Sequence, residues 1–160
     1  MRFSQSTDYA LRVLMYLGLN DGRLATISEI AATYDISRNH LMKVIHRLGR
    51  AGFVHTQRGK GGGIRLARSA TEIYVGDVAR RMEENWDLVE CFRTDGGKCC
   101  IRPVCTLRGV LRHGLNTLLR ALDEFTVEDL LRHRRSELIE LLSPGADEDR
   151  AARSKQPGAQ

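Results

Sequence analysis

The sequence contains no run of 18 apolar residues, which is about the length that a helix needs to cross a membrane, so no membrane span is expected. A secretory signal is also missing, because Asp8 and Arg12 interrupt the apolar positions and no small-residue cleavage site follows. We therefore expect a cytoplasmic protein, in a compartment where thiols stay reduced. This expectation argues against a framework of disulfide bonds between the four cysteines.

Acidic side chains are absent from residues 36–67, although this stretch contains seven basic ones. Residues 1–67 hold 10 lysines and arginines against 4 aspartates and glutamates, whereas the rest of the chain holds 15 against 16. A basic half joined to a neutral half is typical of proteins that bind a polyanion, and it indicates nucleic acid as the partner. The alternative is a solvated basic face without a specific partner.

Three helices are predicted in the first third of the chain. Apolar residues at helical spacing predict the first over residues 6–19. Thr26 followed by Glu29 forms a capping-box pattern that begins the second, and Ser37 is placed to cap the third, over residues 38–50. Only a short turn separates the second helix from the third, which is the spacing of a helix-turn-helix.

A β-hairpin is predicted after the third helix. Two short alternating segments, FVHTQRG and IRLAR, flank the glycine-rich sequence KGGG. Helix, helix, short turn, helix and hairpin is the element order of a winged helix-turn-helix, a fold that binds double-stranded DNA.

In this motif the N-terminal turn of the last helix enters the major groove. Arginine can pair there with guanine and asparagine with adenine, while a slender basic wing can meet the backbone or the minor groove. The predicted DNA-contacting residues are Ser37, Arg38, Asn39, His40, Lys43, Arg58 and Lys60. Arg47 and Arg50 are expected to be solvated or to face phosphate. Two copies would bind a two-fold operator with half-sites roughly 34 Å apart, or a multiple of that.

The second half of the chain predicts a dimerisation arm. A short helix is expected over residues 75–84 and a long one over about residues 104–125. Apolar residues of the long helix step by four, three, four and three, which is heptad spacing; they are Leu111, Leu115, Leu118, Leu122 and Phe125. We expect this stripe to pair with a second copy, because this half offers little other material to cover it. The alternative is packing on its own domain.

These patterns predict a fold that is mainly α with a small β-hairpin wing. The predicted divisions are a winged helix-turn-helix domain over residues 1–84 and a loop over residues 85–106 that contains the cysteines. A dimerisation helix and C-terminal helices follow over residues 107–142. Residues 143–160 are polar and without aromatic side chains, so a disordered tail is expected there.

All four cysteines, Cys91, Cys99, Cys100 and Cys105, fall within fifteen residues. Structural zinc sites generally use short Cys-x2–4-Cys knuckles, and no Cys-x2-Cys pair occurs here. A catalytic thiol would need a general base and a preformed cleft, which the neighbouring sequence does not offer, so an enzyme is not expected. The looser spacings of iron–sulfur ligands match best, with zinc as the less favoured alternative.

Four stretches of the sequence carry a family resemblance. They are QSTDYALR near the start, ISRNHLMKVIHRL in the third helix, RGKGGGIRLAR in the hairpin, and LVECF followed by C-x5-C-x-L. In this combination and order, over roughly residues 1–135, the chain resembles the Rrf-type family of iron–sulfur winged-helix regulators. Within that family it is most similar to the nitric-oxide-responsive repressors.

The resemblance implies that Cys91, Cys99 and Cys105 hold a [4Fe–4S] cluster, with [2Fe–2S] as the alternative. The family has five residues between its second and third cysteines, so the spacing is met only when Cys99 is the ligand. Cys100 is then a spare thiol.

The fourth ligand separates the branches of the family. Members of the IscR type have a histidine three residues after the last cysteine, where this chain has Arg108. The nitric-oxide-responsive members resemble this chain in having an aspartate in the first helix, so the resemblance implies that Asp8 of the partner subunit ligates the cluster. The alternative for Asp8 is a first-turn acid that the helix dipole favours.

The resemblance therefore implies a homodimeric repressor that leaves its operator when nitric oxide attacks the cluster. An iron-responsive regulator of the RirA type would use the same fold and the same cysteines. A zinc-stabilised DNA-binding module without a sensing role is the alternative from another class.

Overall fold

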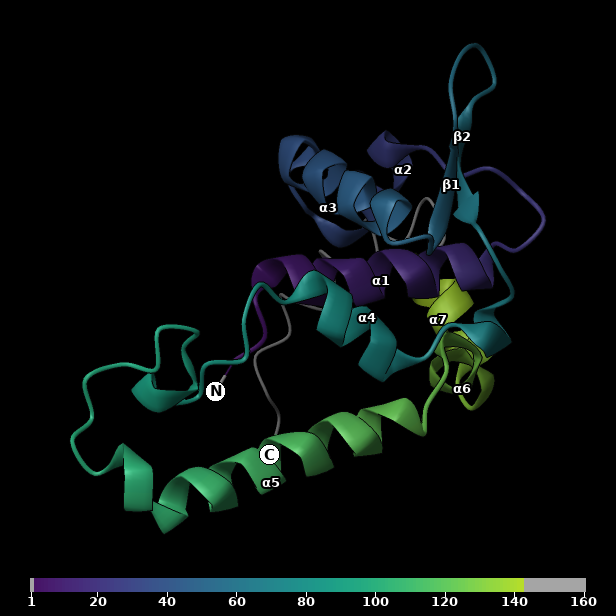
Figure 1. Ribbon diagram of the computed structural model, residues 1–160. Coiled ribbons are helices and arrows are strands. Elements are labelled where there is room, and N and C mark those ends of the chain that lie inside the picture. The colour runs from purple at the N-terminus through teal and green to yellow at the C-terminus, as the bar shows by residue number, and fades with distance from the viewer. Residues whose placement is uncertain (1, 143–160) are drawn as a thin grey trace, which may run out of the picture.

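The computed structural model describes residues 2–142 and is mainly helical with one β-hairpin, as predicted (Figure 1). Its longer elements are α1 Gln5–Leu19, α2 Ile27–Tyr34, α3 Arg38–Arg50, β1 Val54–Gln57, β2 Gly63–Leu66, α4 Val75–Met82, α5 Thr106–Asp123, α6 Val127–Arg132 and α7 Arg135–Leu142. Short 3-10 helices are η1 Ala70–Glu72, η2 Glu90–Phe92 and η3 Arg102–Val104. Among these described residues no helix combines the length and the apolarity that crossing a membrane requires. The predicted tail over residues 143–160 lies outside them.

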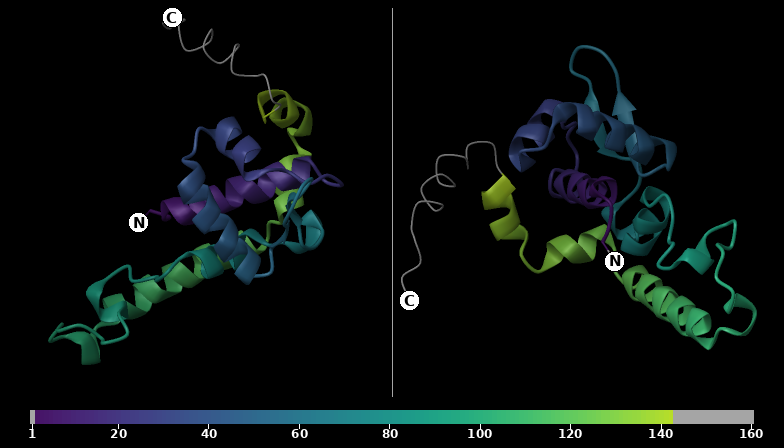
Figure 2. Two further views of the ribbon diagram at one scale, coloured as in Figure 1. Left: turned by 90° about the horizontal axis from the view of Figure 1, so that it is seen from above. Right: turned by 90° about the vertical axis from the view of Figure 1, so that its left-hand side faces the viewer.

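Helix α1 forms the centre of the molecule, because it is buried on more than one side. In Figure 1, α3 and the hairpin lie on one side of α1 and α4 lies on the other, and the right-hand view of Figure 2 agrees. Its fully buried side chains include Ala10, Val13, Leu14 and Tyr16. Helix α1 packs against α3, α4 and α6, so the DNA-binding elements and the C-terminal half are attached to one helix.

The helix-turn-helix follows the predicted pattern. Thr26 and Glu29 form both hydrogen bonds of the capping box at the start of α2. Asp35 then adopts a left-handed φ of 52°, which turns the chain toward α3. Ser37 occupies the capping position of α3, but its side chain makes no capping hydrogen bond, so that part of the prediction is wrong. Its side chain is exposed at the end of the helix.

Glu29 also ties α2 to α1. Its carboxylate accepts hydrogen bonds from the Arg23 guanidinium and the Tyr16 hydroxyl, both at 2.5 Å. The Arg23 hydrogen bond outweighs the cost of burial and lowers the pKa of Glu29 to about 2. The carboxylate therefore stays ionised at neutral pH and holds the helix-turn-helix on the central helix.

The wing depends on glycine. Strands β1 and β2 pair antiparallel from Val54 opposite Leu66 to Gln57 opposite Gly63. Gly59 and Gly61 at the tip have φ of 101° and 77°, which residues with a side chain rarely adopt. Strand β2 is also joined to the segment before α2, where the Ala25 and Ile64 backbones exchange hydrogen bonds of 2.8 and 2.9 Å.

The last described helices, α6 and α7, pack against α1. Val127, Leu131 and Leu142 belong to the same buried core as α1. Helix α6 lies so close to α1 that a Cβ at Gly18 would be 2.8 Å from a Leu131 methyl group. Arg135 at the start of α7 donates a hydrogen bond of 3.2 Å to the Gly18 carbonyl. Residues more than one hundred positions away thus complete the core of the helix-turn-helix half. The division of the chain after residues 84, 106 and 142 stays a prediction.

Helix α5 is attached to the rest of the chain at its C-terminal half. Leu115 and Leu119 are buried, and α5 packs on α4. Arg80 of α4 binds both carboxylate oxygens of Asp123 at 2.5 and 2.7 Å, and these hydrogen bonds lower the pKa of Asp123. The N-terminal half of α5 extends away from the core (Figure 1). One residue of the predicted heptad stripe, Leu115, is therefore buried within its own chain.

Candidate DNA-binding face and cysteine loop

The residues predicted to contact bases lie together at the start of α3. Ser37, Arg38, Asn39 and Lys43 are exposed. His40 is half-buried, because its ring packs edge-on against Tyr9 with 5.0 Å between ring centroids. This contact places the imidazole against α1, whereas the other four side chains face solvent.

Met42 was not predicted and lies on the same exposed side of α3, one turn beyond Arg38 and Asn39. Its side chain is 45% exposed. Thymine presents a methyl group in the major groove, and an apolar side chain can contact it. Helical spacing from the predicted residues is the signal that would have found Met42 from the sequence.

The position of Arg47 differs from the prediction. It was predicted to be solvated or to face phosphate, but its guanidinium donates a hydrogen bond of 2.6 Å to the Met82 carbonyl. The Glu84 carboxylate lies 3.9 Å from another of its nitrogens. Arg47 therefore joins the last turn of α3 to the end of α4, where the cysteine-containing segment begins. Arg50, by contrast, is exposed as expected.

The wing carries its two basic residues at the tip. Arg58 and Lys60 are both exposed. Figure 1 shows the hairpin projecting beside α3, on the side of α1 that is opposite α4 and α5. A basic helix and a basic wing on one side of a domain match the electrostatic pattern of a protein that binds double-stranded DNA.

We predict that Arg38→Ala weakens operator binding by about 1–3 kcal/mol and relaxes the base preference at one position of each half-site. The expected reason is the loss of a paired contact with a guanine edge. Arg58→Ala is the comparison, because loss of a phosphate contact weakens binding to all sequences equally and lowers the salt dependence. Binding titrations on an operator and a scrambled duplex at several salt concentrations separate the two effects; equal losses on both duplexes for Arg38→Ala would contradict base contact.

The cysteines lie on the segment that joins α4 to α5. Cys91 is in η2, Cys99 and Cys100 precede η3, and Cys105 is the capping residue of α5. All four are free thiols; Cys100 is exposed, whereas the other three are half-buried. None of the buried apolar side chains of the described chain comes from residues 83–114. A hydrophobic core therefore does not hold this segment in place.

Two contacts bring the neighbours of the cysteines together. The Glu90 carboxylate accepts a hydrogen bond of 2.8 Å from the Lys98 backbone, which links the residues before Cys91 and Cys99. The Arg112 guanidinium lies over the Phe92 ring, 4.6 Å from its centroid, and joins η2 to α5. Within residues 2–142, however, no three side chains of cysteine, histidine, aspartate or glutamate converge closely enough to bind a metal ion.

Asp8 is placed in the first turn of α1, and its carboxylate pairs with Arg12 at 2.9 Å. The side chain remains 47% exposed. It lines an open hollow of about 680 Å³ that the N-terminal residues form with His40. The carboxylate is thus accessible from outside the chain.

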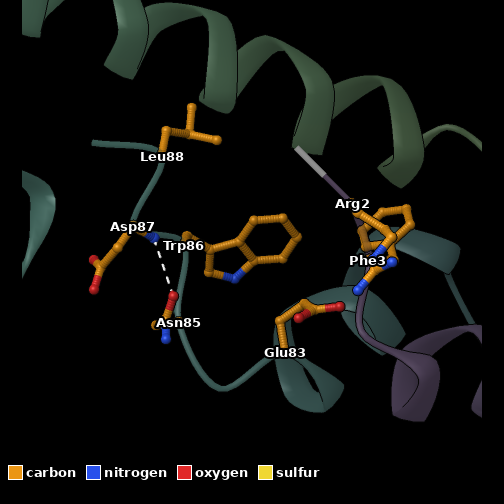
Figure 3. A pocket seen from close by; sticks show the side chains of 7 residues that line it. All are labelled: Arg2, Phe3, Glu83, Asn85, Trp86, Asp87 and Leu88. Atoms are coloured by element: carbon orange, nitrogen blue, oxygen red, sulfur yellow. Dashed lines mark hydrogen bonds between the residues drawn. The ribbon is translucent and has the colours of Figure 1, made fainter. Parts of the chain in front are cut away.

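A second hollow, of about 290 Å³, lies where the start of the chain meets the segment after α4 (Figure 3). The Glu83 carboxylate accepts a hydrogen bond of 2.8 Å from the Ser4 backbone, next to the start of α1. The Phe3 and Trp86 rings meet edge-on with 6.2 Å between centroids. The segment that enters the cysteine loop is therefore attached to the end of α1 that carries Asp8.

The helix-turn-helix, the glycine-tipped wing and the long projecting helix define the class of winged helix-turn-helix transcription regulators. The chain belongs to the Rrf2 family of iron-dependent transcriptional regulators, whose family model matches residues 3–133.

Two relatives are each called HTH-type transcriptional regulator NsrR. The protein from Bacillus subtilis is 46% identical over 143 residues, which cover 89% of this chain and 97% of the relative. The protein from Geobacillus kaustophilus is 47% identical over 137 residues, covering 85% and 93%. The chain is accordingly a DNA-binding transcription regulator and not an enzyme.

Solved structures of regulators share the fold. CymR, the global cysteine regulator of Bacillus subtilis, matches with a TM-score of 0.62 and 27% identity, over 81% of this chain and 95% of that one. IscR of T. potens matches with a TM-score of 0.66 over 99% of this chain and 94% of that one. At 21% identity, this second likeness concerns the fold alone.

Proposed function

We propose that this chain is an iron–sulfur-dependent repressor that responds to nitric oxide. One observation carries the proposal: three half-buried thiols lie on a segment without a hydrophobic core, between the DNA-binding helices and α5. Such a segment gains its stability from bonds to a bound group. The NsrR regulators, at 46% and 47% identity, support the same assignment.

The residues of the loop suit an iron–sulfur cluster in chemistry and in exposure. Cys91, Cys99 and Cys105 supply thiolate ligands, and partial burial limits their access to solvent. Cys100 is exposed and is not part of the proposed set. The Glu90–Lys98 hydrogen bond supports the choice of Cys99, because it holds the backbone of the preceding residue beside η2.

The proposed fourth ligand is Asp8 of the partner subunit. Its exposure and its position on the rim of an open hollow support this role, since the carboxylate is accessible to a second chain. Arg12 would have to share or release the carboxylate, so it competes with the iron for Asp8.

The proposal requires a homodimer, and the free half of α5 offers the surface for it. Leu107 and Val110 of α5 are 61% and 60% exposed, and Val104 of the preceding η3 is 82% exposed. A group of exposed apolar side chains favours pairing with an apolar surface of a second copy. This contact would bring the loop of each subunit close to the other subunit.

When bound, the cluster supplies an iron atom with a weak ligand, at which nitric oxide can react. The chain itself links that site to DNA through two hydrogen bonds. Glu83 binds the start of α1 next to Asp8, and Arg47 binds the end of α4 from the recognition helix α3. When Asp8 is released and the loop moves, these hydrogen bonds transmit the movement to α3 and change its position. A coupling of 1–3 kcal/mol would change DNA affinity about 5–150-fold.

The test is to purify the protein anaerobically, measure iron, sulfide and zinc, and add nitric oxide while following operator binding. We expect a coloured protein with iron and sulfide that loses affinity for the operator as nitric oxide is added. A colourless protein with stoichiometric zinc would contradict the proposal and indicate a zinc-stabilised module. If the iron-loaded protein keeps its operator affinity when nitric oxide is added, but loses it when iron is withheld, it is an iron-responsive regulator.

A further inference from the structure

Three arginines line one hollow beside Cys105. The hollow measures about 420 Å³, lies at the start of α5, and contains side chains of Arg102, Arg108 and Arg112. Arg108 and Arg112 are four residues apart on α5 and so lie on the same side of the helix. Arg102 comes from η3, which directly precedes α5.

The arginines also contact the loop that carries the other cysteines. The Arg102 guanidinium covers Gly96, which is buried beneath it and has no room for a side chain. Arg112 stacks on Phe92, the residue after Cys91. Arg102 and Arg112 therefore contact residues between Cys91 and Cys99, while Arg108 lies beside Cys105 in the hollow.

No carboxylate compensates these charges in the described part of the chain. The ion pairs there involve other arginines, on α1, α3, α4 and the C-terminal helices among others. Two acidic residues of the loop have different partners: Asp95 pairs with Arg93 at 3.0 Å, and Glu90 accepts a hydrogen bond from the Lys98 backbone.

Arg108 has a buried hydrogen-bond donor without an acceptor in the described part of the chain. Its Nε atom is buried, and no acceptor within residues 2–142 takes its hydrogen. A buried donor without an acceptor is unfavourable. Arg102 and Arg112 are exposed and leave their guanidinium groups accessible on the same side of the hollow. The N-terminal end of the 18-residue helix α5 adds further positive potential. These features together describe a basic site that suits an anion.

We infer that Arg102, Arg108 and Arg112 are the counter-charge of the iron–sulfur group that the cysteines hold, an inference that rests on the proposed function. Thiolate and carboxylate ligands give that group negative charge, and guanidinium N–H groups bind anions strongly. Arg108 acts as a positioning residue: it does not bind iron itself, and its buried Nε–H donates a hydrogen bond to the ligated group. Such partners of metal ligands tune both metal affinity and reduction potential.

The test compares Arg108→Gln with Arg120→Gln in the full-length, anaerobically reconstituted protein. Arg120 is exposed in the last turn of the same helix, so its replacement removes an equal charge far from the loop. We expect Arg108→Gln to lower the affinity for iron roughly 10–100-fold in a chelator competition, and to lower the reduction potential. Arg120→Gln should match the wild type in both measurements.

Arg108→Lys is the second variant, because it keeps the charge but loses the Nε–H donor. It should retain most of the reduction potential and lose part of the iron affinity. Circular dichroism and thermal melting of the apo-proteins verify that each variant is folded. Equal iron affinity and potential for Arg108→Gln and Arg120→Gln would overturn the role of the arginines while leaving the proposed function intact. A wild-type protein that takes up no iron and sulfide would instead overturn the proposed function itself.

Discussion

Replacing Cys91, Cys99 or Cys105 by serine is expected to yield protein without iron that has lost repression, whereas Cys100→Ser keeps both properties. Serine holds its proton at neutral pH and does not supply the soft, anionic sulfur that an iron–sulfur cluster needs. Loss of the cluster should lower operator affinity about 5–150-fold, which is the range of a typical coupling between two sites.

The measurement is iron and sulfide per chain in anaerobically purified variants, together with operator binding and expression of a reporter gene. Misfolding should not confuse the result, because residues 83–114 contribute no buried apolar side chain to the described core. Equal melting temperatures of the apo-variants would verify this point. Loss of iron in Cys100→Ser, with iron retained in Cys99→Ser, would show that the ligands are shifted by one position.

The exposed half of α5 leads to the second large effect. Leu107→Glu is expected to convert the protein into a monomer, because it places a charge on the apolar face formed with Val104 and Val110. A monomer contacts only one half-site, and the loss of the second contact should weaken operator binding about 10²–10⁴-fold.

Leu141→Glu is the matched control, since Leu141 is 46% exposed on α7 and lies on another helix. Analytical ultracentrifugation measures the oligomeric state, and binding to a complete operator and to an isolated half-site measures the loss of two-fold contact. Leu107 is 61% exposed within its own chain, so the monomer should stay folded. A Leu107→Glu protein that still sediments as a dimer would place the interface elsewhere.

The helix-turn-helix and the wing could be predicted closely because their signals are local. The capping box of Thr26 and Glu29 forms as expected, and α3 has the predicted bounds over residues 38–50. The hairpin turns at the predicted glycine-rich sequence, where Gly61 has a positive φ, as does Gly59 just before it. Each of these signals involves residues within a few positions of one another, where backbone sterics and hydrogen bonds decide the conformation.

The heptad pattern of α5 shows the limit of such reasoning. Periodicity identifies an apolar stripe but does not say whether the stripe meets its own chain or a second copy. Here Leu115 is buried with Leu119 where α5 packs on α4, and the most exposed apolar residues lie closer to the cysteines. The pairing predicted for the stripe stays a prediction, and the proposed function places the dimer contact at Val104, Leu107 and Val110 instead.

By itself, the sequence determined the order of the helices, the basic recognition helix and wing, and the grouping of the cysteines, because all of these depend on neighbouring residues. Only the tertiary structure decided that α6 completes the core around α1, that Arg47 binds the end of α4, and that Arg108 shares a hollow with two other arginines. These contacts join residues on separate elements, up to more than a hundred positions apart. They arise from the packing of whole elements, which short-range propensities do not encode.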